Sequence, residues 1–151
     1  MRIAFVHNRY IDYRIPLFEL LHRDFDVTFF FELENQEPKT AINSSFSFTP
    51  YIPRRPRYRL SPSLVTKLLR EDFDIYLAGD IGLPNTYLTC AIAKLKDKPF
   101  IVWTEEWHPD CYLDKTKFRW KKKLLEVADA CITSGSKAKP KLPAASVVGV
   151  P

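Results

Sequence analysis

The chain has 151 residues, a mass of 17.6 kDa, 46% hydrophobic residues and 27% charged residues. A chain of this length fits one domain with a buried core, and its composition excludes a disordered or fibrous protein. Its net charge of +5 favours an anionic partner, whereas its 4 glycines are too few for the glycine-rich loops of P-loop and dinucleotide-binding proteins.

The sequence lacks the usual marks of a membrane or secreted protein. No apolar run approaches the length of a membrane-spanning helix, about 20 residues, and the apolar stretch at residues 3–6 is too short for a signal peptide. Cys90, Cys111 and Cys131 lie far apart and match no metal-ligand spacing. We therefore expect a cytoplasmic protein with reduced thiols and no metal site.

The first half of the chain predicts strands alternating with helices. A short buried strand is predicted at residues 3–6, a loop at 8–13, a helix from Pro16 to Asp24, and a β-rich apolar run at 25–31. Strand, helix and strand within about 30 residues match the size of one βαβ unit. Residues 46–51 alternate aromatic with polar residues, which predicts an edge strand.

The second half continues the alternation. Helices are predicted at residues 62–70, with Ser61 as the N-cap, at 85–96 and at 115–127. Strands are predicted at 74–79, 99–104, 130–133 and 146–150. This order predicts an α/β fold, a doubly wound and mostly parallel Rossmann-like sheet with helices on both faces. Ligands of such sheets bind beyond the carboxyl ends of the strands.

Three stretches carry a family resemblance: RIAFVHNRYIDYRIPLFELL at residues 2–21, IYLAGDIGLPNTYLTCAIAKLKDKPFIVWTEE at 75–106, and ADACITSGSKAK at 128–139. Together they resemble the N-terminal half of GT-B glycosyltransferases of the GT4-like kind. The resemblance covers nearly the whole chain. It implies that residues 1–151 form an acceptor-binding Rossmann-like domain, and that a second domain, absent from this sequence, holds the nucleotide sugar.

The same resemblance implies sugar transfer with retention of anomeric configuration, without a metal or another cofactor, to an acceptor that many family members receive on a lipid. This fragment alone would be inactive. One departure lies after the first strand, where many members have Gly-Gly and this chain has His7-Asn8-Arg9-Tyr10. Backbone contact between this loop and a donor phosphate is therefore not expected.

The best catalytic candidates follow the strand at residues 99–104. Glu105, Glu106 and His108 would project from the ligand-binding edge of the sheet. A carboxylate or imidazole there can orient or deprotonate an acceptor hydroxyl. The alternative is that these side chains cap a helix or lie in an exposed loop.

Other loops at the same edge supply candidates for binding the acceptor or a phosphate. They are Arg9, Tyr10, Asp12, Arg14, Asp80, Gly82, Ser134 and Ser136. Exposed arginines at the start of a helix suit phosphate. Alternatively, Arg14 anchors its loop on Asp12 or Asp80, and Asp80 serves only the turn at Gly82. His7 is expected to be structural.

The predicted helix at residues 115–127 is strongly basic. On a helical wheel, Lys115, Arg119, Lys122 and Lys123 share an arc of roughly 100°, opposite Trp120, Leu124 and Val127. This face suits an anionic membrane surface, and the alternative is an ordinary solvated face.

Three functions fit the sequence to different degrees. The first is half of a two-domain glycosyltransferase. The second is a stand-alone Rossmann-like module that binds a carbohydrate or a phosphate-bearing ligand, or one subunit of a split transferase. Nucleic-acid binding ranks last, because only the charge supports it and no recognised motif is present.

Overall fold

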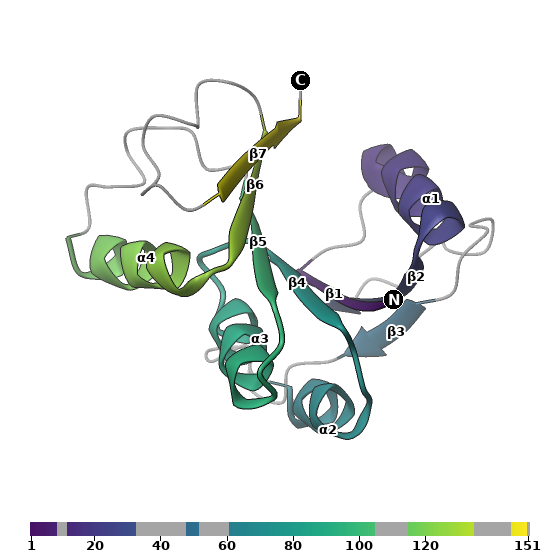
Figure 1. Ribbon diagram of the computed structural model, residues 1–151, viewed down its shortest axis with the longest axis horizontal. Helices are drawn as coiled ribbons and strands as arrows, with labels where there is room; N and C mark the ends of the chain where they lie inside the picture. The colour runs from purple at the N-terminus through teal and green to yellow at the C-terminus, as the bar shows by residue number, and fades with distance from the viewer. Residues whose placement is uncertain (9–11, 33–47, 52–60, 105–114, 135–145, 151) are drawn as a thin grey trace.

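Within the described residues, seven parallel strands form one sheet in the order β3-β2-β1-β4-β5-β6-β7 (Figure 1). The computed structural model describes residues 1–8, 12–32, 48–51, 61–104, 115–134 and 146–150. The strands are β1 (Arg2–His7), β2 (Asp26–Glu32), β3 (Phe48–Tyr51), β4 (Ile75–Gly79), β5 (Phe100–Thr104), β6 (Ala130–Ser134) and β7 (Ser146–Val150). The strand order reverses between β1 and β4, which is the topological switch point of the sheet.

Helices cover both faces of this sheet. They are α1 (Ile15–Asp24), α2 (Pro62–Arg70), α3 (Pro84–Leu95) and α4 (Lys115–Val127), and a 3-10 turn, η1 (Asp12–Arg14), precedes α1. Helix α1 lies on one side, and α2, α3 and α4 lie on the other (Figure 1). Right-handed crossovers running in opposite directions from the switch point require this division. The predicted doubly wound α/β fold is confirmed.

The element boundaries follow local chemistry. A proline lies in the first turn of α1, α2 and α3, where its missing N–H costs no helical hydrogen bond. Ser61 caps α2, because its hydroxyl accepts from the Leu64 amide at 3.5 Å. Helices α1 and α3 each begin one residue earlier than predicted, and β2 begins at Asp26 because Phe25 instead caps the end of α1.

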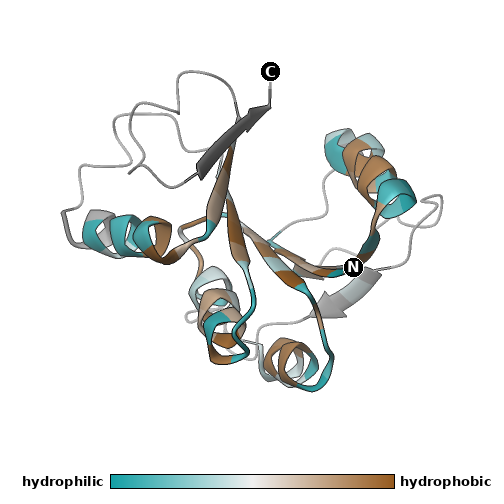
Figure 2. Ribbon diagram, viewed as in Figure 1, coloured by the Kyte–Doolittle hydropathy of each residue, from teal (hydrophilic) through white to brown (hydrophobic). Residues whose placement is uncertain are grey.

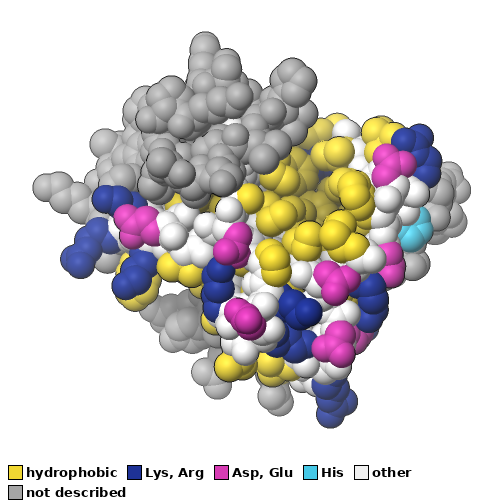
Figure 3. All heavy atoms as spheres, in the orientation of Figure 1, with side chains coloured by type: hydrophobic (Ala, Val, Ile, Leu, Met, Phe, Trp, Pro, Cys, Tyr) yellow, Lys and Arg dark blue, Asp and Glu magenta, His cyan; other side chains and the backbone are white. Residues whose placement is uncertain are grey.

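Each face of the sheet has its own apolar core. The core under α1 holds Phe5, Phe18, Val27, Phe29, Phe31 and Leu77. The larger core under α2, α3 and α4 includes Phe30, Leu64, Leu68, Tyr76, Phe100 and Val102. Figure 2 shows the contrast between the hydrophobic inner strands and the mostly hydrophilic α4. Figure 3 shows a broad patch of hydrophobic side chains beside α1, with mixed acidic and basic side chains below it.

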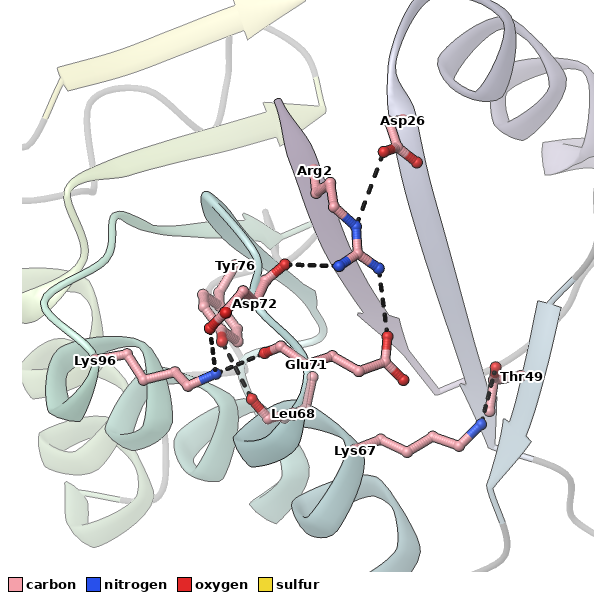
Figure 4. Close-up of polar contacts among 9 residues, drawn as sticks. All are labelled: Arg2, Asp26, Thr49, Lys67, Leu68, Glu71, Asp72, Tyr76 and Lys96. Carbon is pink, nitrogen blue, oxygen red and sulfur yellow. Dashed lines mark hydrogen bonds and ion pairs between the residues drawn. The ribbon is translucent and has the colours of Figure 1, made fainter.

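The amino-terminal edge of the sheet is held by an arginine network (Figure 4). The Arg2 guanidinium donates to the Asp72 carbonyl at 3.0 Å and to Glu71 at 3.5 Å, and it lies 3.8 Å from the Asp26 carboxylate. The same guanidinium stacks over the Phe73 ring at 5.0 Å. Arg2 thereby ties β1 to β2 and to the segment that follows α2.

Candidate functional site

His7 and Gly79 meet at the carboxyl ends of β1 and β4, at the switch point. The two strands pair through Val6 and Ala78, one residue earlier in each strand. The His7 ring occupies the space that a side chain at position 79 would need, because an added Cβ would lie 2.3 Å from His7 Cδ2. Glycine at position 79 therefore lets the imidazole lie across the adjacent strand. His7 is buried, with 5% exposure, and it packs near the rings of Phe5 and Trp103.

Arg14 reaches this imidazole from η1. Its Nη1 lies 2.6 Å from His7 Nε2, and Arg14 itself is only 7% exposed. Because guanidinium has no acceptor, Arg14 donates and His7 Nε2 accepts, which places the imidazole proton on Nδ1. The guanidinium also lies 5.2 Å from the ring centroids of both Tyr13 and Trp103. Arg14 is thus held between aromatic rings, a favourable site for a delocalised cation.

Asp80 connects three strands at the same edge. Its Oδ2 accepts from Asn8 Nδ2 at 2.8 Å, and its Oδ1 accepts from the Gly82 amide at 3.0 Å. Its own amide donates to the Trp103 carbonyl at 3.1 Å. Asp80 has a φ of 68°, in the left-handed region that aspartate tolerates better than most residues. The turn role considered for Asp80 and Gly82 is therefore present, and an acceptor-binding role stays a prediction.

The first turn of α3 is fastened to the end of β4. The Thr86 hydroxyl donates to the Asp80 carbonyl at 2.7 Å, and the Gly79 carbonyl lies 3.1 Å from the same oxygen. Asn85, the preceding residue, is 1% exposed. Neither the nitrogen nor the oxygen of its carboxamide has a hydrogen-bond partner in the structure described above.

Several predicted site residues lie outside the described residues: Arg9, Tyr10, Glu105, Glu106, His108 and Ser136. Asp12 lies in η1 and Ser134 in β6, but the side chains of these two residues are outside the described set. Of the predicted binding residues, Arg14, Asp80 and Gly82 are described with their contacts. Their roles in binding a ligand remain predictions.

Two polar residues of this edge were not predicted as functional. Asn8 meets Asp80 across 72 residues of sequence, a separation that no local pattern reveals. Asn85 lies in a helix of small and apolar residues, where its burial has no sequence signal. His7 was expected to be structural, and its packing against Gly79 and Arg14 agrees with that expectation.

The two described thiols, Cys90 and Cys131, are both buried. Within the described ranges, no group of three His, Cys, Asp or Glu side chains could hold a metal ion. Burial raises the pKa of the Cys131 thiol to about 11 and also raises the pKa of Cys90. Both thiols are buried and stay protonated at neutral pH.

Helix α4 presents a basic face to solvent. Arg119, Lys122 and Lys123 are exposed, whereas Leu124 and Leu125 are 4% and 7% exposed and belong to the core. Lys115 begins the helix, and its side chain is outside the described set. Trp120 was grouped with Leu124 on the apolar side, but it is 62% exposed. It therefore borders the basic face. No described helix is long and apolar enough to cross a membrane.

The parallel sheet, its switch point and its two helix layers define a Rossmann-like domain. This fold is similar to that of Anabaena HepE, in crystal structures with UDP, with UDP and glucose, and with UDP-glucose. The TM-score is 0.72 in each case, at 12%, 12% and 13% sequence identity. The matches cover 99% of this chain and 43%, 44% and 43% of the HepE chains, so this chain spans less than half their length.

At such low identity, the likeness shows the fold alone. No protein-family model and no curated protein sequence matches the chain.

Proposed function

We propose that this chain is the acceptor-side half of a GT-B glycosyltransferase that transfers a sugar from a nucleotide-sugar donor. The observation that supports it most is the fold match over 99% of the chain to HepE, whose structures contain UDP and UDP-glucose. The polar edge at the β1–β4 switch point lies where ligands of doubly wound sheets bind. The finer assignment, a GT4-like enzyme acting with retention, rests on the sequence resemblance.

In this proposal, residues 1–151 form the N-terminal domain and a second domain holds the nucleotide. The shortage of glycine agrees with this division, because this chain offers no glycine-rich phosphate loop. During transfer, the acceptor oxygen bonds to the anomeric carbon, the bond from that carbon to the donor phosphate breaks, and the hydroxyl proton moves to a base. Glu105, Glu106 and His108 are the proposed residues for orienting the acceptor and taking that proton.

The binding residues proposed around this centre are Arg9, Tyr10, Asp12, Arg14, Asp80, Gly82, Ser134 and Ser136. Among them, Arg14 has fixed surroundings, because His7 and two aromatic rings hold its guanidinium. A guanidinium that is already ordered loses less entropy when it binds an anion. Arg14 therefore supplies positive charge to the carboxyl edge without a large ordering cost.

A lipid-linked acceptor and a peripheral membrane location belong to the same proposal. Exposed Arg119, Lys122 and Lys123 beside the exposed Trp120 form a surface suited to anionic lipid. Each basic residue near such a surface contributes about 1 kcal/mol, so replacing Lys115, Arg119, Lys122 and Lys123 together by Gln should weaken binding at least 100-fold. Sedimentation with phosphatidylserine vesicles measures this. Unchanged binding of the variant would contradict the membrane role.

The native polypeptide and its activity test the transferase proposal. An immunoblot with an antibody against these residues should detect a band near or above twice 17.6 kDa. In that protein, Glu105→Gln, Glu106→Gln and His108→Ala are assayed by release of UDP from UDP-glucose. At least one variant should lose about 100-fold or more in rate.

Two results would redirect the account. Three fully active variants would show that the catalytic site is misplaced. A band at 17.6 kDa would favour the stand-alone module or the split transferase, and a pull-down would then search for a separate catalytic subunit.

A further inference from the structure

The carboxamide of Asn85, in the first turn of α3, is a buried polar group with unsatisfied hydrogen bonds. Its donor and its acceptor both lack a partner among the described residues, although the side chain is 1% exposed. Buried polar groups are almost always hydrogen-bonded in folded proteins. A buried carboxamide whose nitrogen and oxygen both lack a hydrogen-bond partner therefore indicates a partner from outside the described residues. Thr89, one turn further along the same helix, follows the rule, because its hydroxyl donates to the Asn85 carbonyl at 2.7 Å.

The position of Asn85 indicates a ligand. Helix α3 has 12 residues and begins directly beyond β4, beside the switch point. Its N-cap is Leu83, which has no side-chain group to satisfy the first-turn amides, whereas Ser61 caps α2. The Thr86 hydroxyl donates to the Asp80 carbonyl and lies 3.1 Å from the Gly79 carbonyl, which holds this turn against the end of β4. The turn is thus rigid, uncapped and placed at the ligand-binding edge.

A second buried polar group with an unsatisfied hydrogen bond lies on the same side of the sheet. The Thr133 hydroxyl, near the carboxyl end of β6, is 0% exposed and has no hydrogen-bond partner within the described ranges. Alternation along β6 places Thr133 on the face of Cys131, which belongs to the core under α2, α3 and α4. Strands β4 and β6 are two places apart in the sheet, about 10 Å.

The chemistry of the carboxamide selects the ligand class. A carboxamide offers two N–H donors and one oxygen acceptor. A carboxylate or an ionised phosphodiester has no hydrogen to donate, so it can fill only the donors and leaves the oxygen unsatisfied. A hydroxyl group both donates and accepts, and therefore completes the amide. We propose that the first turn of α3 binds a hydroxyl of the acceptor sugar through Asn85, with Thr133 as a second contact. This inference rests on the proposed function and assigns it a specificity residue.

Burial of Asn85 has a kinetic consequence. A ligand reaches a side chain that is 1% exposed only after neighbouring groups separate. Association that requires such an opening is slower than simple docking. Glucose association at Asn85 should therefore be slower than association at an exposed site.

The test follows the Asn85 side-chain amide signals of the ¹⁵N-labelled chain during titration with D-glucose and, separately, acetate, an anion that only accepts hydrogen bonds at neutral pH. Glucose should shift or replace the Asn85 signals in a saturable way, and acetate should leave them unchanged. Asn85→Leu should abolish the glucose response and raise Tm by about 2–4 °C, since it removes an unsatisfied group. Thr89→Val is the matched control and should keep the glucose response.

The outcomes separate this inference from the proposed function. If glucose shifts amide signals elsewhere on the carboxyl edge but leaves the Asn85 signals unchanged, the Asn85 site is overturned. The transferase proposal then still stands. An equal response to acetate would show an anion site and also overturn it. No glucose response at any residue would contradict both. The titration of the unmodified chain decides the matter even if Asn85→Leu does not fold.

Discussion

At the amino-terminal edge of the sheet, Arg2 contacts the carboxylates of Glu71 and Asp26 and the Asp72 carbonyl, with 45% of its side chain exposed. At the carboxyl-terminal edge, Arg14 is 7% exposed and is held by an imidazole and two aromatic rings. The first arginine has carboxylate partners in solvent, where ion pairs contribute modestly. The second keeps a cation in a buried aromatic setting. The amino edge therefore joins elements through exposed ion pairs, whereas the carboxyl edge holds a buried cation against aromatic rings, as the proposed ligand site requires.

Substitution of Gly79, at the carboxyl edge, should give the largest loss of stability. Gly79→Ala should lower the free energy of unfolding by about 3 kcal/mol, because its Cβ would lie 2.3 Å from the His7 ring. Urea denaturation measures this loss. Gly82→Ala is the control, since its Cβ would meet only Asp80 Oδ1 at 3.2 Å, and it should cost much less. Equal losses in the two variants would mean that His7 does not depend on Gly79.

The arginine network at the amino edge should give a smaller effect. Arg2→Ala should lower the free energy of unfolding by about 1 kcal/mol. Part of this loss should disappear in high salt, because the ion pairs are partly exposed. Arg23→Ala removes a fully exposed pair with Asp24 and should leave the urea midpoint unchanged. A loss at Arg2 as large as that of Gly79→Ala would remove the contrast between the edges.

The smallest expected effect is a pH dependence at Asp129. Burial raises the pKa of this carboxyl, but hydrogen bonds from Lys94 and the Phe100 amide outweigh burial and hold the pKa below its ordinary value of 3.8. Its contribution to stability is therefore present above that value and is lost as the pH falls through the lower, folded pKa.

Asp129→Asn should accordingly reduce the difference between urea midpoints measured at about pH 6 and about pH 3. The corresponding change in the free energy of unfolding should stay below about 1 kcal/mol, since solvent screens the half-exposed pair of Lys94 and Asp129. An unaltered pH profile would show that other carboxyls dominate the acid transition.

Periodicity and capping were enough to predict the order of strands and helices. Buried apolar runs such as residues 3–6 and Ser61 before Pro62 are local signals, and the structure uses them as expected. The contacts at the carboxyl edge are not local. Asn8 reaches Asp80 across 72 residues, and His7 depends on the missing side chain of Gly79 in another strand. The exposure of Trp120 was also missed, because a helical wheel places Trp120 near Leu124 but does not show which arc faces the core.

We propose that the carboxyl edge of this sheet, and not the amino edge, binds the ligand. A map of backbone amide shifts in the ¹⁵N-labelled chain, with and without D-glucose, tests it directly. The account predicts saturable shifts at Gly79, Asp80 and Gly82, with Arg2 and Asp74 unchanged. Shifts confined to the amino edge, or no shift at any residue, would contradict the claim.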